Sequence, residues 1–163
     1  MNRVLQRPGC TPEEICTELA RHFRVRYDEV ALLQVVGGYL RFLCPAQLRG
    51  GSIPLTSSAV AAKTARNRHP EFFNDFVNVQ HFSVFEVMAS SQVQKADNNE
   101  HVIQKLMTAP ILDGNDKVWG VVQISRKGTS CATAGPDFTF ADLEELTRAA
   151  AAVGRRMTET RPL

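Results

Sequence analysis

The residues best suited to chemistry lie in one stretch, 71–89, where aromatic and polar side chains are interleaved. It holds five of the chain's nine phenylalanines, together with polar neighbours: Phe72, Phe73, Phe76, Phe82 and Phe85 among Asn74, Asp75, Asn78, His81 and Glu86. Aromatic walls can hold a planar or apolar ligand that the polar groups orient. The pattern also fits phenylalanines in a core and polar groups that cap turns, and cores are commoner than pockets. The sequence leaves both interpretations open.

Catalytic and metal-binding chemistry has little support. His81 and Glu86 are five residues apart, which on a helix is not one face. No nucleophile with a positioned base is evident, so we predict that the protein is not an enzyme. The four cysteines and four histidines show no zinc spacing, and no metal or other cofactor is identified.

Polar residues inside apolar runs are further candidates. Gln34 and Gln123 each interrupt such a run and either line a cavity or face solvent, whereas Arg41 is expected to be solvated. Ser57 and Ser58 at a helix start offer free N–H groups to an anion or a carbonyl. The strand end 125–127 (Ser-Arg-Lys) suits the rim of a pocket for an acidic ligand, although a solvated end is favoured. The candidate ligand-binding set is Gln34, Ser57, Phe76, His81, Phe82, Phe85, Glu86, Thr108 and Gln123.

Composition describes an ordinary globular chain. The 163 residues are 44% hydrophobic and 22% charged, with a net charge of +2, which calls for neither a nucleic-acid nor a membrane partner. No signal segment or C-x-x-C motif is present, so the thiols are expected to be reduced, in the cytoplasm. We predict a lead-in over residues 1–10, one domain over 11–157 and a tail over 158–163.

Two hairpins are predicted to supply the inner strands. Residues 104–126 contain two apolar runs around Asp113-Gly114-Asn115-Asp116, where Gly114 can accept the positive φ of a tight turn. Gly120 in the second run allows a close backbone approach. Residues 30–36 and 39–44 form the other hairpin around Gly37-Gly38. The runs that hold Gly120 and Gln34 should lie side by side.

Helix signals complete an α+β pattern with an antiparallel sheet. Thr11 and Glu14 form a capping box, and Thr139 with Asp142 repeats it before the last helix. A third helix should begin at Thr56 or Ser57 and run to about residue 68, and a short one should cover 81–88. Residues 47–55 are expected as a loop or irregular edge strand, and 90–100 as a flexible loop.

Four pieces carry a family resemblance: VALLQVVGGYLRFL, IPLTSSAVAAKTARNRHP, MTAPILDGNDKVWGVVQISRK and DFTFADLEELTRAAAAVGRRM. In this order and spacing, residues 11–157 resemble a GAF domain. The resemblance implies a GAF/PAS-like (profilin-like) fold, with about six antiparallel strands and the terminal helices on one face. Short helices would cover the other face over a small-molecule pocket, between the sheet and residues 56–89. The expected function is sensory and regulatory ligand binding in signal transduction.

Departures from the family's sequence motifs argue against two classes of ligand. Ser125-Arg126 replaces the Asn-Lys pair of cyclic-nucleotide-binding members, and Leu143 replaces a Glu, so a cyclic nucleotide is not supported. No Cys-His dipeptide is present for a bilin. The alternatives are a docking module with a collapsed pocket, or an enzyme similar to free methionine sulfoxide reductase, although Cys44 and Cys131 lack its setting. We also expect a homodimer through the terminal helices and an unidentified effector protein.

Overall fold

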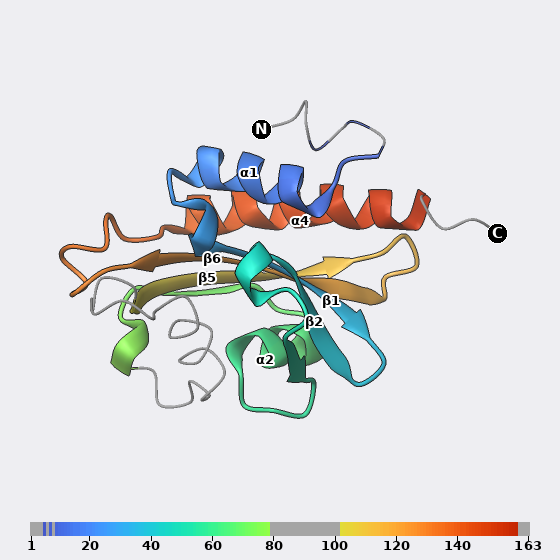
Figure 1. Ribbon diagram of the computed structural model, residues 1–163, viewed down its shortest axis with the longest axis horizontal. Coiled ribbons are helices and arrows are strands. Elements are labelled where there is room, and N and C mark those ends of the chain that lie inside the picture. The colour runs from blue at the N-terminus through green and yellow to red at the C-terminus, as the bar shows by residue number, and fades with distance from the viewer. Residues whose placement is uncertain (1–4, 6, 8, 79–101, 160–163) are drawn as a thin grey trace.

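The computed structural model describes residues 5, 7, 9–78 and 102–159, and within them the chain forms one six-stranded antiparallel sheet. The strand order is β3-β2-β1-β6-β5-β4 (Figure 1). The strands are β1 (Val30–Val36), β2 (Tyr39–Cys44), β3 (Ser52–Pro54), β4 (Glu71–Phe73), β5 (Ile103–Leu112) and β6 (Val118–Lys127). The predicted α+β architecture is confirmed. The edge strand expected within residues 47–55 is β3.

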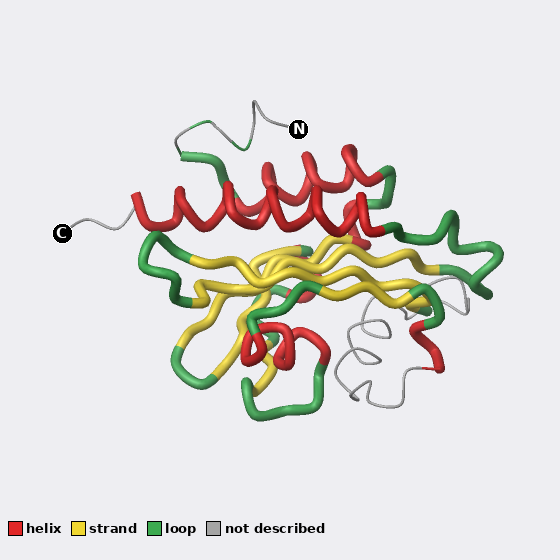
Figure 2. The backbone as a smooth tube through the Cα atoms, turned by 180° about the vertical axis from the view of Figure 1, so that it is seen from behind, coloured by secondary structure: helices red, strands yellow, loops and turns green. Residues whose placement is uncertain are grey.

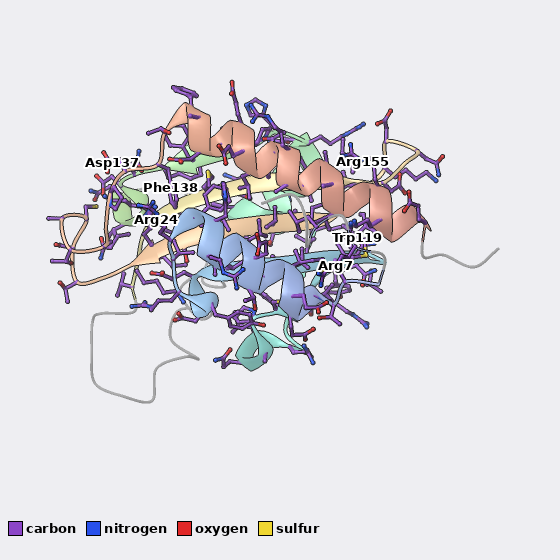
Figure 3. The ribbon with its side chains drawn as sticks, turned by 90° about the horizontal axis from the view of Figure 1, so that it is seen from above. Arg7, Arg24, Trp119, Asp137, Phe138 and Arg155 are labelled. Carbon is purple, nitrogen blue, oxygen red and sulfur yellow. The ribbon has the colours of Figure 1, made fainter. Side chains whose placement is uncertain are left out.

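Two long helices cover one face of the sheet, and a short helix lies on the other (Figure 2). The covering pair is α1 (Pro12–Phe23) and α4 (Phe140–Glu159), and the short helix is α2 (Val60–Asn67). Seen from above, α1 and α4 lie side by side, with Phe138 just before the start of α4 (Figure 3). The described connections include three 3₁₀ turns, of which η1 (Tyr27–Glu29) lies between α1 and β1, η2 (Ala46–Leu48) between β2 and β3, and η3 (Phe76–Asn78) after β4.

Local capping explains where α1 and α4 begin. The Oγ1 of Thr11 accepts from the Glu14 N–H at 3.2 Å, and the Glu14 carboxylate accepts from the Thr11 N–H at 2.9 Å. Thr139 and Asp142 make the same reciprocal pair before α4. Both predicted capping boxes are confirmed, and each satisfies N–H groups that a helix end leaves unpaired.

The start predicted for α2 is wrong. This helix begins at Val60 rather than after Thr56 or Ser57, with Ala59 as its N-cap. The Ser57 hydroxyl accepts from the Ala59 N–H at 3.3 Å, and the Ser57 carbonyl accepts from Arg66 at 2.8 Å. These bonds hold the segment before Val60 in a turn, because a serine side chain competes for backbone groups.

The hairpins confirm the predicted inner strands, since Gln34 of β1 pairs with Gly120 of β6. Gly37 adopts φ +61° in the β1–β2 turn, as expected. In the β5–β6 turn the positive φ of 58° falls on Asp116, so its assignment to Gly114 is wrong. The Asp113 carboxylate accepts from the N–H groups of residues 115 and 117, at 2.8 and 3.0 Å. The loop therefore winds around Asp113 and turns at its end.

Each sheet face has its own core. Leu19, Phe23, Leu32, Ile124 and Leu146 belong to the core under α1 and α4. The opposite core, beneath α2, includes buried residues of β1, β2, β6 and α2: Leu33, Phe42, Val121, Ala61 and Ala62. No helix in the described part of the chain is long and apolar enough to span a membrane.

The aromatic stretch 71–89 divides at residue 78. Phe72 and Phe73, predicted as part of a cover, instead belong to edge strand β4, which pairs with Met107 and Leu106 of β5. The predicted helix over 81–88, the loop over 90–100, and His81, Phe82, Phe85 and Glu86 lie outside the described residues.

Candidate functional site

A hollow lies on the sheet face opposite α1 and α4, where β1 begins and β6 ends. It encloses about 470 Å³ of space that no atom fills, part of it open to solvent. The lining among the described residues comes from η1, the sheet and the β2–β3 connection: Asp28, Glu29, Ala31, Phe42, Pro45, Leu48, Ile53, Ile103, Leu106, Gln123, Ser125 and Lys127.

Most of the wall is apolar. Phe42, Leu48 and Ile53 approach from the β2–β3 side, and Ile103 and Leu106 approach from β5. Leu106 is 1% exposed and also packs against Phe76, and this contact holds the Leu106 side chain in place. Such a wall can hold the carbon skeleton of a ligand but cannot bind charge.

The polar end of the hollow is organised by Glu29 of η1. Its carboxylate accepts from the Lys127 N–H at 2.7 Å and from the Arg26 N–H at 2.7 Å. Its carbonyl accepts from the Ser125 hydroxyl at 3.2 Å. The ammonium of Lys127 donates to the Asp28 carbonyl at 3.0 Å and lies 3.8 Å from the Asp28 carboxylate. These bonds fix η1 against the end of β6.

Lys127 is a charged group in a poorly hydrated place. Its side chain is 5% exposed. Burial lowers the pKa of the ammonium, while the neighbouring carboxylates of Asp28 and Glu29 oppose that shift.

Gln123 is the polar residue on the floor of the hollow. It lies between Ala31 of β1 and Thr108 of β5 in the pairing register, and it is 8% exposed. Among the described side chains, its Nε2 is one of two buried nitrogens with no hydrogen-bond partner, the other being Nε of Arg126. A buried donor without a partner costs free energy, so this position suits a ligand atom that accepts a hydrogen bond.

The other described candidates from the sequence do not line the hollow. Gln34 alternates with Leu33, so it lies on the face of Leu32, under α1 and α4. Thr108 is fully buried, and its hydroxyl lies 3.1 Å from that of Thr64. Ser57 is bonded within its own turn, and Phe76 packs behind Leu106.

The polar residues just before position 78 have structural partners. The Asn74 amide donates to the Phe138 carbonyl at 3.0 Å and accepts from the Phe138 N–H at 2.8 Å. The Asp75 carboxylate accepts from the Asn78 amide at 2.7 Å. At these positions the turn-capping interpretation describes what the side chains do.

The solvated strand end expected at residues 125–127 is wrong. Ser125 and Lys127 are buried and face the hollow, because η1 folds over the end of β6. Arg126 lies on the other face, where its guanidinium stacks 4.8 Å from the Phe138 ring and donates to the Phe23 carbonyl at 3.2 Å. Burial lowers the pKa of this guanidinium.

The contribution of Asp28, Glu29 and the β2–β3 connection was not foreseen. One sequence signal was available, since Gln123, Ser125 and Lys127 recur at every second position of a strand and so share a face. A polar stripe of this kind marks a face that is either solvated or lines a cavity, and the fold of η1 over β6 makes it the second.

Metal ligands and thiols are not found among the described residues that line the hollow. The described residues contain no group of histidine, cysteine and carboxylate side chains placed to hold a metal ion. Cys16 and Cys44 are buried, and the Cys44 thiol donates to the Pro12 carbonyl of α1 at 3.1 Å. None of the four cysteines is among the described residues that line the hollow.

Comparison with known proteins agrees with this architecture. Residues 12–157 match the family model of the GAF domain. No curated protein matches the sequence. The GAF domain of a phosphoenolpyruvate-protein phosphotransferase from Coxiella burnetii superposes with a TM-score of 0.67 at 9% identity, covering 99% of this chain and 86% of that one.

Two further structures show how widely the fold is used. The GAF domain of a two-component sensor histidine kinase from Bacillus halodurans gives a TM-score of 0.61 at 18% identity, with 91% and 96% of the two chains covered. The reduced form of fRMsr from Staphylococcus aureus gives 0.52 at 16% identity, with 78% and 70% covered. Identities this low establish a shared fold, not a shared ligand.

Proposed function

The chain belongs to the GAF domain family, and from that premise we propose that it is a regulatory module that binds a small molecule in the hollow. The observation that carries the proposal is Gln123, a buried amide with an unpartnered nitrogen on the floor of an apolar hollow. A protein that used this face only for packing would gain stability from an apolar residue there.

The test is a thermal-shift screen of the full chain against a metabolite library, with a variant that fills the hollow. Ala31→Leu adds three carbons on the floor of the hollow beside Gln123. Ala132→Leu makes the same change at an exposed position in the loop after β6, outside α1, α4 and the described lining of the hollow, and serves as the matched control. We expect compounds that raise the melting temperature of the parent and of the control, but not of Ala31→Leu. Silence of the whole library would contradict the proposal.

Ligand binding would be transmitted to other proteins through α1 and α4. These helices pack directly on strands whose other face forms the hollow, and His22 of α1 contacts Glu145 of α4. A ligand that shifts β1 or β6 would therefore move the pair. We propose that this pair forms a homodimer or contacts an effector protein, in the cytoplasm, where the four free cysteines remain reduced. Light scattering of the parent and of Ala151→Arg tests the dimer, which the exposed charge should dissociate.

The enzymatic alternative rests on the shared fold with fRMsr. A reductase of that kind needs a redox-active thiol at the pocket, whereas Cys44 lies against α1 and Cys131 contacts the Asn74 carbonyl. The position of the thiols therefore favours the regulatory proposal.

A further inference from the structure

We infer that the molecule bound in the hollow is uncharged and carries a hydrogen-bond acceptor that Nε2 of Gln123 reaches. The inference rests on the proposed function and adds the chemical class of the ligand. It depends on three features of the hollow: the charges at one end, which neutralise one another, the unpartnered donor on the floor, and the apolar wall.

The charges at the polar end already neutralise one another. Lys127 is held by Asp28, through the carbonyl at 3.0 Å and the carboxylate at 3.8 Å. Arg26 lies 3.2 Å from the Asp28 carboxylate and 3.4 Å from that of Glu29. Two cations thus face two carboxylates. A charged ligand would have to displace one of these partners or enter without a counter-ion, and both are costly in a poorly hydrated site.

Both oxygens of the Glu29 carboxylate are engaged by backbone groups that hold η1 in place. The carboxylate accepts from the backbone N–H groups of Arg26 and Lys127, both at 2.7 Å, and Glu29 is 7% exposed. The Ser125 hydroxyl is likewise used, since it donates to the Glu29 carbonyl. A ligand that replaced either of these bonds would detach η1 from β6.

Gln123 is different, because its donor is buried and unused. The residue is 8% exposed, and Nε2 has no partner. A carbonyl, ether or ring-nitrogen acceptor would recover the lost hydrogen bond without adding charge. The remaining surface, formed by Phe42, Leu48 and Leu106, suits the hydrocarbon part of such a molecule.

The experiment uses the full chain and fragments in matched sets of four, of which acetophenone, ethylbenzene, benzoate and benzylammonium are one. Within a set the size is nearly constant, while the acceptor and the charge change. Binding is followed by ¹H–¹⁵N spectra, in which the side-chain amide of Gln123 reports directly on the floor of the hollow. We expect the neutral ketone-type member to shift this signal and to bind about tenfold more tightly than the hydrocarbon.

Two matched substitutions isolate the donor. Gln123→Met keeps length and removes the amide, and Gln34→Met makes the same change on the other sheet face. The preference for ketone over hydrocarbon should fall about tenfold in Gln123→Met and stay unchanged in Gln34→Met. Gln123→Met should also melt no lower than the parent, because it removes an unpaired buried donor.

The outcomes separate the two proposals. Charged fragments that bind in the hollow would overturn the ligand class and leave the regulatory function standing. A hydrocarbon that binds as tightly as its ketone partner would overturn the role of Gln123. If no fragment of any class perturbs the hollow, the ligand class and the proposed function are both wrong.

Discussion

A Cβ atom on Gly120 of β6 would stand 2.1 Å from the carbonyl oxygen of Leu33 on β1. The backbones of the two central strands therefore approach as closely as they do only because position 120 has no side chain. The neighbouring pair Gln34–Gly120 sets the register that sends Gln123 to the hollow, so this approach connects the fold to the candidate site.

Gly120→Ala should destabilise the protein by about 2 to 3 kcal/mol, because a backbone oxygen cannot move aside as a flexible side chain can. Chemical denaturation measures the change. Gly38→Ala is the control, since nothing lies within 4 Å of a Cβ built there. A Gly120→Ala variant as stable as the control would show that β1 and β6 separate easily.

Gly154 has the same role between α4 and the sheet. A Cβ there would lie 1.8 Å from the carbonyl oxygen of Leu112, at the end of β5. Gly→Ala inside a helix ordinarily stabilises by about 1 kcal/mol. For Gly154→Ala we expect the opposite sign, a loss of about 2 kcal/mol, because α4 must lift from the hairpin. Thermal melting decides the sign, and a raised melting temperature would contradict the packing described here.

Thr108 tests whether a buried polar group next to the hollow is structural. The Thr108 hydroxyl pairs with the Thr64 hydroxyl, and the Thr64 hydroxyl also donates to the Val60 carbonyl at 2.9 Å. Thr108→Val should cost about 1 to 2 kcal/mol of stability by removing one partner of a buried pair. It should leave fragment binding unchanged, whereas Gln123→Met alters it. Denaturation and fragment titration of both variants provide the comparison, and a loss of binding in Thr108→Val would place this hydroxyl in the site.

The features foreseen from the sequence are those set by neighbouring residues. The capping boxes of Thr11 and Thr139 need only a spacing of three, and the Gly37-Gly38 turn needs only its own φ angles. The strand runs were also visible, because their apolar composition is continuous. The arrangement of the sheet and the terminal helices was predicted from the family resemblance rather than from these local signals.

The candidate site could not be predicted from neighbouring residues alone, because it depends on the register between β1 and β6 and on a bulge in β2. Gln34 and Gln123 look equivalent in sequence, and only the pairing of Gln34 with Gly120 puts them on opposite faces. A shift by one residue would have put both on one face. Similarly, an irregularity in β2 pairs Cys44 with Leu32 and Phe42 with Leu33. That extra residue turns Cys44 toward α1, away from the face of Phe42.

Lys127 gives the pH dependence expected of the polar end of the hollow. Burial lowers its folded-state pKa below the ordinary value of 10.5. Between the lowered pKa and 10.5, the unfolded chain holds more protons at this position than the folded protein does. The contribution of Lys127 to stability must therefore rise as the pH rises through that window.

Denaturation of the parent and of Lys127→Met from neutral pH to 10.5 measures this contribution, and the difference in stability should move in favour of the parent. Lys117→Met, at an exposed lysine in the β5–β6 turn, controls for the loss of a positive charge. A difference that stays flat, or that moves toward the methionine variant, would mean that the ammonium is well hydrated and that the charges around η1 are open to solvent.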